Sequence, residues 1–293
     1  MVMIMNWKTN DNKDDNEDNF ENRKKKILDQ IKEREDRNFS YMCCSITGDP
    51  KVGKTGIALD CRTDEEIEQG MKVFVLDFDD GAEPTWDSCW DRDDNLIIFN
   101  PLEILKDGSI DWLETFSNAH AFCDYVKEET KSDNVKAVIF DGLDKAVEGA
   151  SDVLRSHLVK HQKREQSIIL ETDSVRVSPL DWKIRNRVHD RLLTAFLSIN
   201  AHRFMITHMK PIYGDIVNPT PIGSVPDWLK TTPARFIQMI HITKTKVGST
   251  TNYVAELQAS KTNHDLVGKE WTIFTTNGDN AWYGIPELQE GTL

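Results

Sequence analysis

The sequence predicts an α/β protein with a mostly parallel central sheet flanked by helices and an antiparallel β extension at its C-terminal end. Short β-rich runs alternate with helical stretches from residue 41 to about residue 207, which is typical of βαβ units. After residue 236, two β-rich runs flank a Gly-Ser-Thr-Thr turn, a pattern that indicates an antiparallel hairpin. No repeat of 20–50 residues is visible.

The alternation assigns the elements in chain order. The expected strands are 41–47, 72–77, 95–99, 135–140 and 203–207, and the expected helices are about 54–69, 111–129, 144–163 and 179–199. The last helix has the clearest start, because Ser178 can cap it, Pro179 fits its first position and Asp181 can act as a capping carboxylate. The C-terminal extension comprises strands 236–243, 252–259 and 270–275.

Three segments are expected along the chain. Residues 1–19 form a disordered acidic tail, because 9–19 are polar and acidic without an apolar period. Residues 20–37 form an N-terminal helix with a thin apolar face, which either docks on a neighbouring subunit or packs on its own core. Residues 38–293 form one domain, in which the β extension occupies about 236–293.

The chain has 293 residues, with 36 Lys and Arg against 49 Asp and Glu, for a net charge of −13. This charge is uneven: residues 60–94 carry 13 acidic and 3 basic residues, whereas 151–293 carry 14 acidic and 17 basic ones. The total therefore excludes no partner, and restricts any nucleic-acid contact to the second half. Five cysteines without a CxxC pair indicate neither a disulfide scaffold nor structural zinc. Without a membrane span or signal peptide, we expect a cytoplasmic protein.

One motif dominates the sequence. Residues 48–55 read G-D-P-K-V-G-K-T, a full match to the P-loop pattern, between an apolar strand and a helix-compatible run. In such a loop, backbone amides surround phosphate oxygens, the lysine reaches the β- and γ-phosphates and the hydroxyl ligates Mg²⁺. Lys54 and Thr55 are the expected lysine and hydroxyl. The residues expected to bind the nucleotide are Gly48, Asp49, Pro50, Lys51, Val52, Gly53, Lys54, Thr55 and Gly56.

Three further strands end in polar residues. Asp141 ends the apolar strand 135–140 and is expected to hold Mg²⁺ together with Thr55. The acidic loop 77–83 offers a general base, with Asp79 the first choice, Asp80 the second and Glu83 a weaker third; the alternative is an acidic surface loop. His208 follows strand 203–207 and is either a sensor of the γ-phosphate or a buried, satisfied histidine. His and Cys residues do not cluster, so no metal other than Mg²⁺ is expected.

Over residues 38–275 the chain resembles RecA-like P-loop ATPases, and most of all compact phage and archaeal-virus members similar to the RecA/RadA recombinase core. Gly48–Thr55 and Asp141-Gly142-Leu143-Asp144 carry the resemblance, with support from loop 77–83, Asp181-Trp182 and Thr207-His208. The resemblance places Asp79 where the family has a catalytic glutamate one methylene longer. It implies that 209–233 is a mobile loop facing DNA or a ring centre. It also implies a ring or filament in which Lys261, or less clearly Arg235, reaches a neighbour's ATP.

The resemblance implies an ATPase that acts on single-stranded DNA, in recombination or annealing during phage or virus replication, together with viral replication or recombination proteins. The basic stretch 155–191 and the aromatic residues Tyr213, Trp182 and Trp228 fit single-strand binding, although both tryptophans could be core residues, which we favour for Trp182. The alternatives are a ring-shaped helicase or DNA-packaging motor, and a nucleotide-switched protein-interaction module.

Overall fold

A computed structural model describes residues 20–29, 41–89, 93–162, 181–214, 219–276 and 281–293. The chain divides into two units, Met1–Ser40 and Tyr41–Leu293. In the first unit, residues 20–29 form a helix, as predicted. The predicted tail 1–19 and the remainder of the predicted helix lie outside the described residues.

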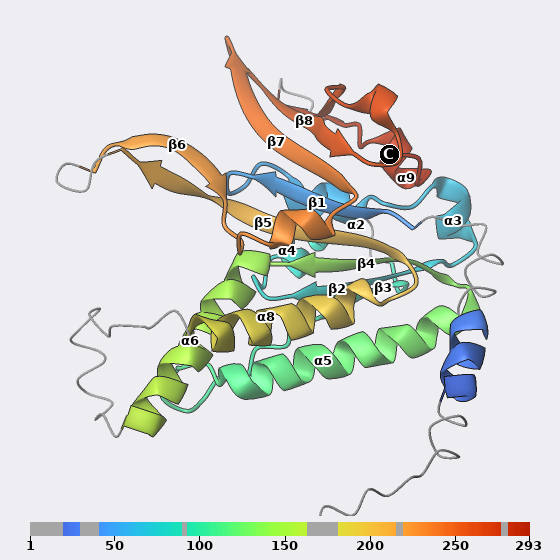
Figure 1. Cartoon of the computed structure of the whole chain (residues 1–293). Helices are drawn as coiled ribbons and strands as arrows, with labels where there is room; N and C mark the ends of the chain where they lie inside the picture. The colour runs from blue at the N-terminus through green and yellow to red at the C-terminus, as the bar shows by residue number, and fades with distance from the viewer. Residues whose placement is uncertain (1–19, 30–40, 90–92, 163–180, 215–218, 277–280) are drawn as a thin grey trace, which may run out of the picture. The chain divides into compact units, whose positions relative to one another are not determined.

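The second unit is built on a single sheet (Figure 1). Its strands lie in the order β10-β9-β8-β7-β1-β5-β4-β2-β3, and β6 pairs with β5 outside this path. Their bounds are β1 Cys43–Gly48, β2 Lys72–Asp77, β3 Leu96–Phe99, β4 Val135–Asp141, β5 His202–Tyr213, β6 Pro221–Pro226, β7 Gln238–Val247, β8 Thr250–Ser260, β9 Glu270–Thr276 and β10 Ala281–Trp282. The pairs from β7 to β3 are parallel, whereas β8, β9 and β10 add antiparallel strands beyond β7. The predicted fold class is confirmed.

Helices cover both faces of this sheet. Their bounds are α2 Lys54–Leu59, α3 Asp64–Glu68, α4 Ala82–Cys89, α5 Trp112–Glu129, α6 Leu143–Gln162, α8 Trp182–Leu197 and α9 Pro286–Gln289, with short 3-10 turns at Thr130–Ser132, Thr232–Arg235 and His264–Leu266. One apolar cluster joins the sheet to α5, α6 and α8, and a second joins it to α2, α4 and α9. Alternate residues of β2 enter the two clusters: Val73 and Val75 one, Phe74 and Leu76 the other. The central strands are therefore buried on both sides.

Three predicted elements differ from the structure. The helix expected over 54–69 is two short helices, because Thr63 starts a new helix by accepting a hydrogen bond from the Glu66 amide while Glu66 caps Thr63 in return. Strand β5 continues to Tyr213 because its second half pairs with β6, so the described part of 209–233 contains an antiparallel hairpin. Helix α8 begins at Trp182, and the Asp181 side chain does not cap it. Ser178 and Pro179 lie outside the described residues.

The predicted C-terminal hairpin is confirmed, and it is longer than expected, with β7 and β8 paired from Gln238↔Ser260 to Val247↔Thr250. In the described ranges, no helix is long and apolar enough to cross a membrane.

Candidate nucleotide-binding site

The predicted phosphate-binding loop connects the buried end of β1 to the start of α2. Its backbone has positive φ angles at Gly48 (154°), Lys51 (61°) and Gly53 (94°). A Cβ atom on Gly48 would lie 2.5 Å from the backbone oxygen of Ile242 on β7 and 2.9 Å from the Val52 side chain. Glycine is therefore required at this position for the loop to lie against β7.

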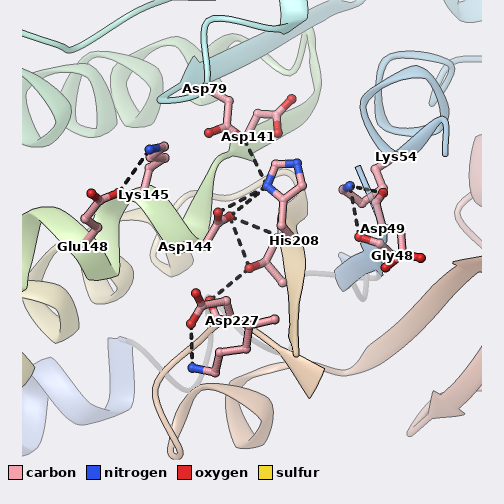
Figure 2. A network of polar contacts seen from close by, with 12 residues as sticks. Gly48, Asp49, Lys54, Asp79, Asp141, Asp144, Lys145, Glu148, His208 and Asp227 are labelled. Atoms are coloured by element: carbon pink, nitrogen blue, oxygen red, sulfur yellow. Dashed lines mark hydrogen bonds and ion pairs between the residues drawn. The ribbon is translucent and has the colours of Figure 1, made fainter. Parts of the chain in front are cut away.

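Lys54, the first residue of α2, is buried beneath this loop. Its Nζ donates hydrogen bonds to the carbonyl oxygens of Gly48 (3.1 Å) and Asp49 (2.8 Å), as Figure 2 shows. Burial lowers the pKa of Lys54, and the nearby carboxylates of Asp141, Asp144 and Asp79 act in the opposite direction. The ammonium group is thus held at the loop by backbone carbonyls and stabilised by acidic groups from β4, from α6 and from the loop after β2.

Thr55 and Asp141 meet although 86 residues separate them. The Thr55 hydroxyl donates to Asp141 Oδ2 at 2.7 Å. Asp141 is only 2% exposed, and burial, reinforced by Asp77 and Asp79, raises its pKa to about 7. A hydroxyl next to a buried carboxylate is a donor set that fits Mg²⁺, because this cation takes oxygen ligands and its charge offsets the cost of ionising the acid.

His208 lies between two carboxylates at the same edge of the sheet (Figure 2). Its Nδ1 is 3.2 Å from Asp144 Oδ2 and 3.5 Å from Asp79 Oδ2. The hydrogen bond with Asp144 raises the pKa of His208. Burial raises the pKa of Asp79, and the Asp144 charge adds to this. His208 is half-buried, and its partners are acidic, so the structure favours a charged histidine over an inert core residue.

Asp144 is a site residue to which the sequence assigned no role. It lies in the first turn of α6, where burial acts to raise its pKa but hydrogen bonds and the charge of His208 lower it. Its Oδ1 also accepts from the His208 amide at 3.3 Å. Within the described residues, Asp79, Asp144 and His208 form a group whose ligand atoms lie within 4.8 Å of one another, close enough to hold a metal ion. The group contains one histidine and two aspartates, and it forms because the strand order brings these residues together.

The acidic loop after β2 places its three candidate bases in different surroundings. Asp79 joins His208, and Gly142 permits this, since a Cβ there would lie 3.0 Å from the Asp79 carboxyl. Asp80 is exposed and accepts from Asn100 Nδ2 at 3.1 Å, away from the cluster. Glu83 is exposed on α4.

Asp77 holds this loop in place and was not singled out from the sequence. It is buried, and its two oxygens accept from the amides of Asp79 (3.0 Å) and Ala82 (2.8 Å). An aspartate whose carboxyl accepts from the backbone amide two residues on is typical of such a turn.

Arg235 and Lys261 lie near the start of β1, at the opposite end of the strands from the candidate nucleotide site. The Lys261 amide donates to Ile237, and the Arg235 carbonyl accepts from the Cys43 thiol, at the start of β1. The predicted phosphate-binding loop follows the other end of β1, about 16 Å away at 3.3 Å per residue. Neither side chain is therefore near the loop of its own chain.

The three candidate stacking residues have different surroundings. Trp182 is 39% exposed, so the preference for a core position is wrong; its place at the start of α8 leaves it outside the packed face. Trp228 packs against Phe236, with ring centroids 5.5 Å apart. Tyr213, at the end of β5, is exposed.

No protein-family model and no curated protein matches the chain. Among solved structures, it is similar to a KaiC-like protein from the hyperthermophilic archaeon Pyrococcus horikoshii, with 13% identity over 79% of this chain and 84% of that one, and a TM-score of 0.44. It is also similar to a RadB recombinase, with 15% identity over 80% of this chain and 89% of that one, and a TM-score of 0.42. The description of the site rests on the contacts of Lys54, Thr55 and Asp141.

Proposed function

We propose that this protein binds ATP and Mg²⁺ and hydrolyses the nucleotide. The observation that carries the proposal is the convergence of three groups at one sheet edge: the glycine-dependent loop, the buried Lys54, and the Thr55–Asp141 pair. The loop amides and Lys54 bind the phosphates, and Thr55 and Asp141 hold the metal ion. When bound there, Mg²⁺ neutralises charge on the phosphate oxygens.

Asp79 is the proposed general base that accepts a proton from the attacking water. Its carboxyl lies at the same edge of the sheet as the Thr55–Asp141 pair, and its backbone amide donates a hydrogen bond to Asp77. His208 faces this carboxyl at 3.5 Å and opposes the effect of burial on its pKa. His208 therefore keeps Asp79 closer to the ionised form that a base requires, whereas the Asp144 charge acts in the opposite direction.

We further propose that the ATPase acts on DNA as a homo-oligomer, in recombination or single-strand annealing, with phage or virus replication as its setting. Support comes from the sequence resemblance and from the positive balance of residues 151–293. The positions of Arg235 and Lys261, remote from the loop of their own chain, fit a contact with a neighbouring subunit.

ATP turnover with Lys54→Ala tests the proposal. We expect the variant to lose hydrolysis by at least about 100-fold, because removing one group that stabilises developing charge costs that much. Lys106→Ala, which removes a lysine exposed in the loop before α5, serves as the control and keeps wild-type turnover. Normal hydrolysis by Lys54→Ala would overturn the assignment of the loop.

The same assay with single- and double-stranded DNA tests the DNA role. Stimulation by single strands is the expected result. Strand displacement by the purified protein would select the motor alternative, and tight ATP binding with negligible turnover and no DNA affinity would select the interaction module.

A further inference from the structure

A basic groove runs between α5 and α8 in the second unit, on the helical layer opposite the one that contains α2. Its volume is about 950 Å³. The charged and titratable groups that line it are His120 and Lys127 from α5, and Lys183, Arg187, Asp190 and Arg191 from α8. None of them takes part in the candidate nucleotide site.

The cations of this groove are largely uncompensated. Lys183, Arg187 and Arg191 are exposed, and none makes an ion pair with another described residue. Lys127 pairs with Asp124 at 3.3 Å, and Asp190 is the acidic side chain among the lining residues. Burial lowers the pKa of His120; Asp124 opposes this shift, and Lys127 and Arg191 add to it. A chain with a net charge of −13 thus keeps one concave surface positive.

The cations of α8 form a row. Lys183, Arg187 and Arg191 recur every four residues, so they lie on one side of the helix at steps of about 6 Å. Such a row offers successive sites for a ligand that carries regularly spaced negative charges.

An aromatic side chain lies at one end of this row. Trp182 precedes the lining residue Asn186 by four residues, which places both on the same side of α8. Trp182 is 39% exposed, and the Arg185 guanidinium lies 4.3 Å from the centroid of its ring. An exposed tryptophan beside a row of cations combines base stacking with phosphate binding.

We propose that this groove binds single-stranded nucleic acid, with phosphates at Lys183, Arg187 and Arg191 and a base stacked on Trp182. The inference rests on the proposed action on DNA and locates it on α5 and α8, away from the β5–β6 hairpin where the sequence resemblance expects a DNA-facing loop. An acidic protein segment would satisfy the cations but would not require the exposed indole.

Fluorescence anisotropy with a labelled oligo(dT) of about 12 nucleotides, measured at several salt concentrations, tests the groove. Arg187→Gln/Arg191→Gln removes two cations from it, and Lys106→Gln/Lys246→Gln removes two exposed cations elsewhere. We expect the salt slope of the groove variant to fall by about 1.4, since each phosphate contact to a single strand contributes about 0.7. The control keeps the wild-type slope. Equal slopes for the two variants would overturn the proposal.

Substitution of Trp182 provides a test that is independent of charge. Trp182→Ala should weaken oligo(dT) binding by about 5- to 150-fold, the range for loss of one stacked base. Trp182→Phe should restore most of the affinity. All groove variants should keep wild-type ATP turnover without DNA, which also shows that they are folded. Wild-type affinity in Trp182→Ala would contradict the assignment.

A competitor identifies the class of ligand. Polyglutamate of the same charge number should displace oligo(dT) poorly; equal displacement would indicate an acidic protein partner and overturn the proposal. If the wild type hydrolyses ATP but does not bind oligo(dT), the groove proposal fails while the ATPase proposal stands. Normal turnover by Lys54→Ala would overturn the ATPase proposal and leave the groove proposal standing.

Discussion

His208 shows how one side chain sets the charge of its neighbours. It lies within 3.5 Å of carboxyl oxygens of both Asp79 and Asp144, and its positive charge opposes protonation of Asp79. In His208→Asn this charge is lost, so the pKa of Asp79 rises further. We expect the acid limb of the kcat profile to move to higher pH.

A kcat series between about pH 5 and 9 measures this shift. His208→Lys is the matched control, since it keeps a cation beside Asp79 and should keep the acid limb near that of the wild type. An unshifted acid limb in His208→Asn would show that Asp79 is not the base or that His208 does not act on it.

His202 is a buried histidine that links stability to pH. Its Nδ1 accepts a hydrogen bond from the Met42 amide (3.1 Å), and burial lowers its pKa from 6.5 to about 3. Because the folded pKa is the lower one, the contribution to stability is complete above pH 6.5 and is lost as the pH falls towards 3. About 2 kcal/mol should be lost between pH 6.5 and pH 5.

His202→Asn tests this linkage, because an asparagine oxygen can accept the same hydrogen bond but does not titrate. Urea unfolding at pH 7 and pH 5 should show that the variant loses about 2 kcal/mol less than the wild type. Equal losses in the two proteins would indicate that His202 does not titrate in this range.

At the level of elements, Gly149 determines how closely α6 approaches α5. A Cβ on Gly149 would lie 2.1 Å from the Trp112 ring, which is held by a hydrogen bond from its Nε1 to Asp152. Alanine gains up to about 1 kcal/mol of helix propensity. Displacing the ring costs about 1–3 kcal/mol, so we expect a net loss.

A thermal melt should therefore show a lower Tm for Gly149→Ala, by about 2–4 °C for each kcal/mol lost in a domain of this size. In a Trp112→Leu background the same substitution should cost less or become stabilising, since the obstructing ring is absent. A higher Tm in the wild-type background would mean that Trp112 moves freely.

The elements also show which local signals were decisive. The break between α2 and α3 has a local sequence signal, because Thr63-x-x-Glu66 is a capping box. The length of β5 has no such local signal. Met209–Tyr213 is a strand because it pairs with β6, and this pairing is a tertiary contact. Likewise Trp182 follows the helical pattern, but only the packing of α8 decides that its ring stays exposed.

At the scale of the whole molecule, the sheet separates Lys261 from the phosphate-binding loop of its own chain. If Lys261 serves a neighbour's site, Lys54→Ala and Lys261→Ala subunits lack different halves of a shared site. Mixing the two inactive variants should restore about a quarter of the wild-type turnover, because random assembly pairs the two intact halves at that frequency in a head-to-tail interface.

Turnover of the mixture after co-refolding, compared with each variant alone, measures this complementation. Lys54→Ala mixed with the double variant Lys54→Ala/Lys261→Ala is the control and should stay inactive. No recovery in the first mixture, with both variants in the same oligomer, would place the role of Lys261 within its own chain or outside catalysis.

By itself, the sequence determined the fold class, the glycine-containing loop Gly48–Thr55 and the buried strand that ends in Asp141. These features are local, since hydrophobic period, glycine position and capping residues act over a few neighbouring residues. The tertiary structure alone decided that Asp79, rather than Asp80, meets His208 and Asp144, and that cations of α5 and α8 face one groove. Asp144 and His208 are 64 residues apart, and they meet because β5 lies between β1 and β4. That strand order follows from the packing of the whole sheet, and no local sequence pattern predicts it.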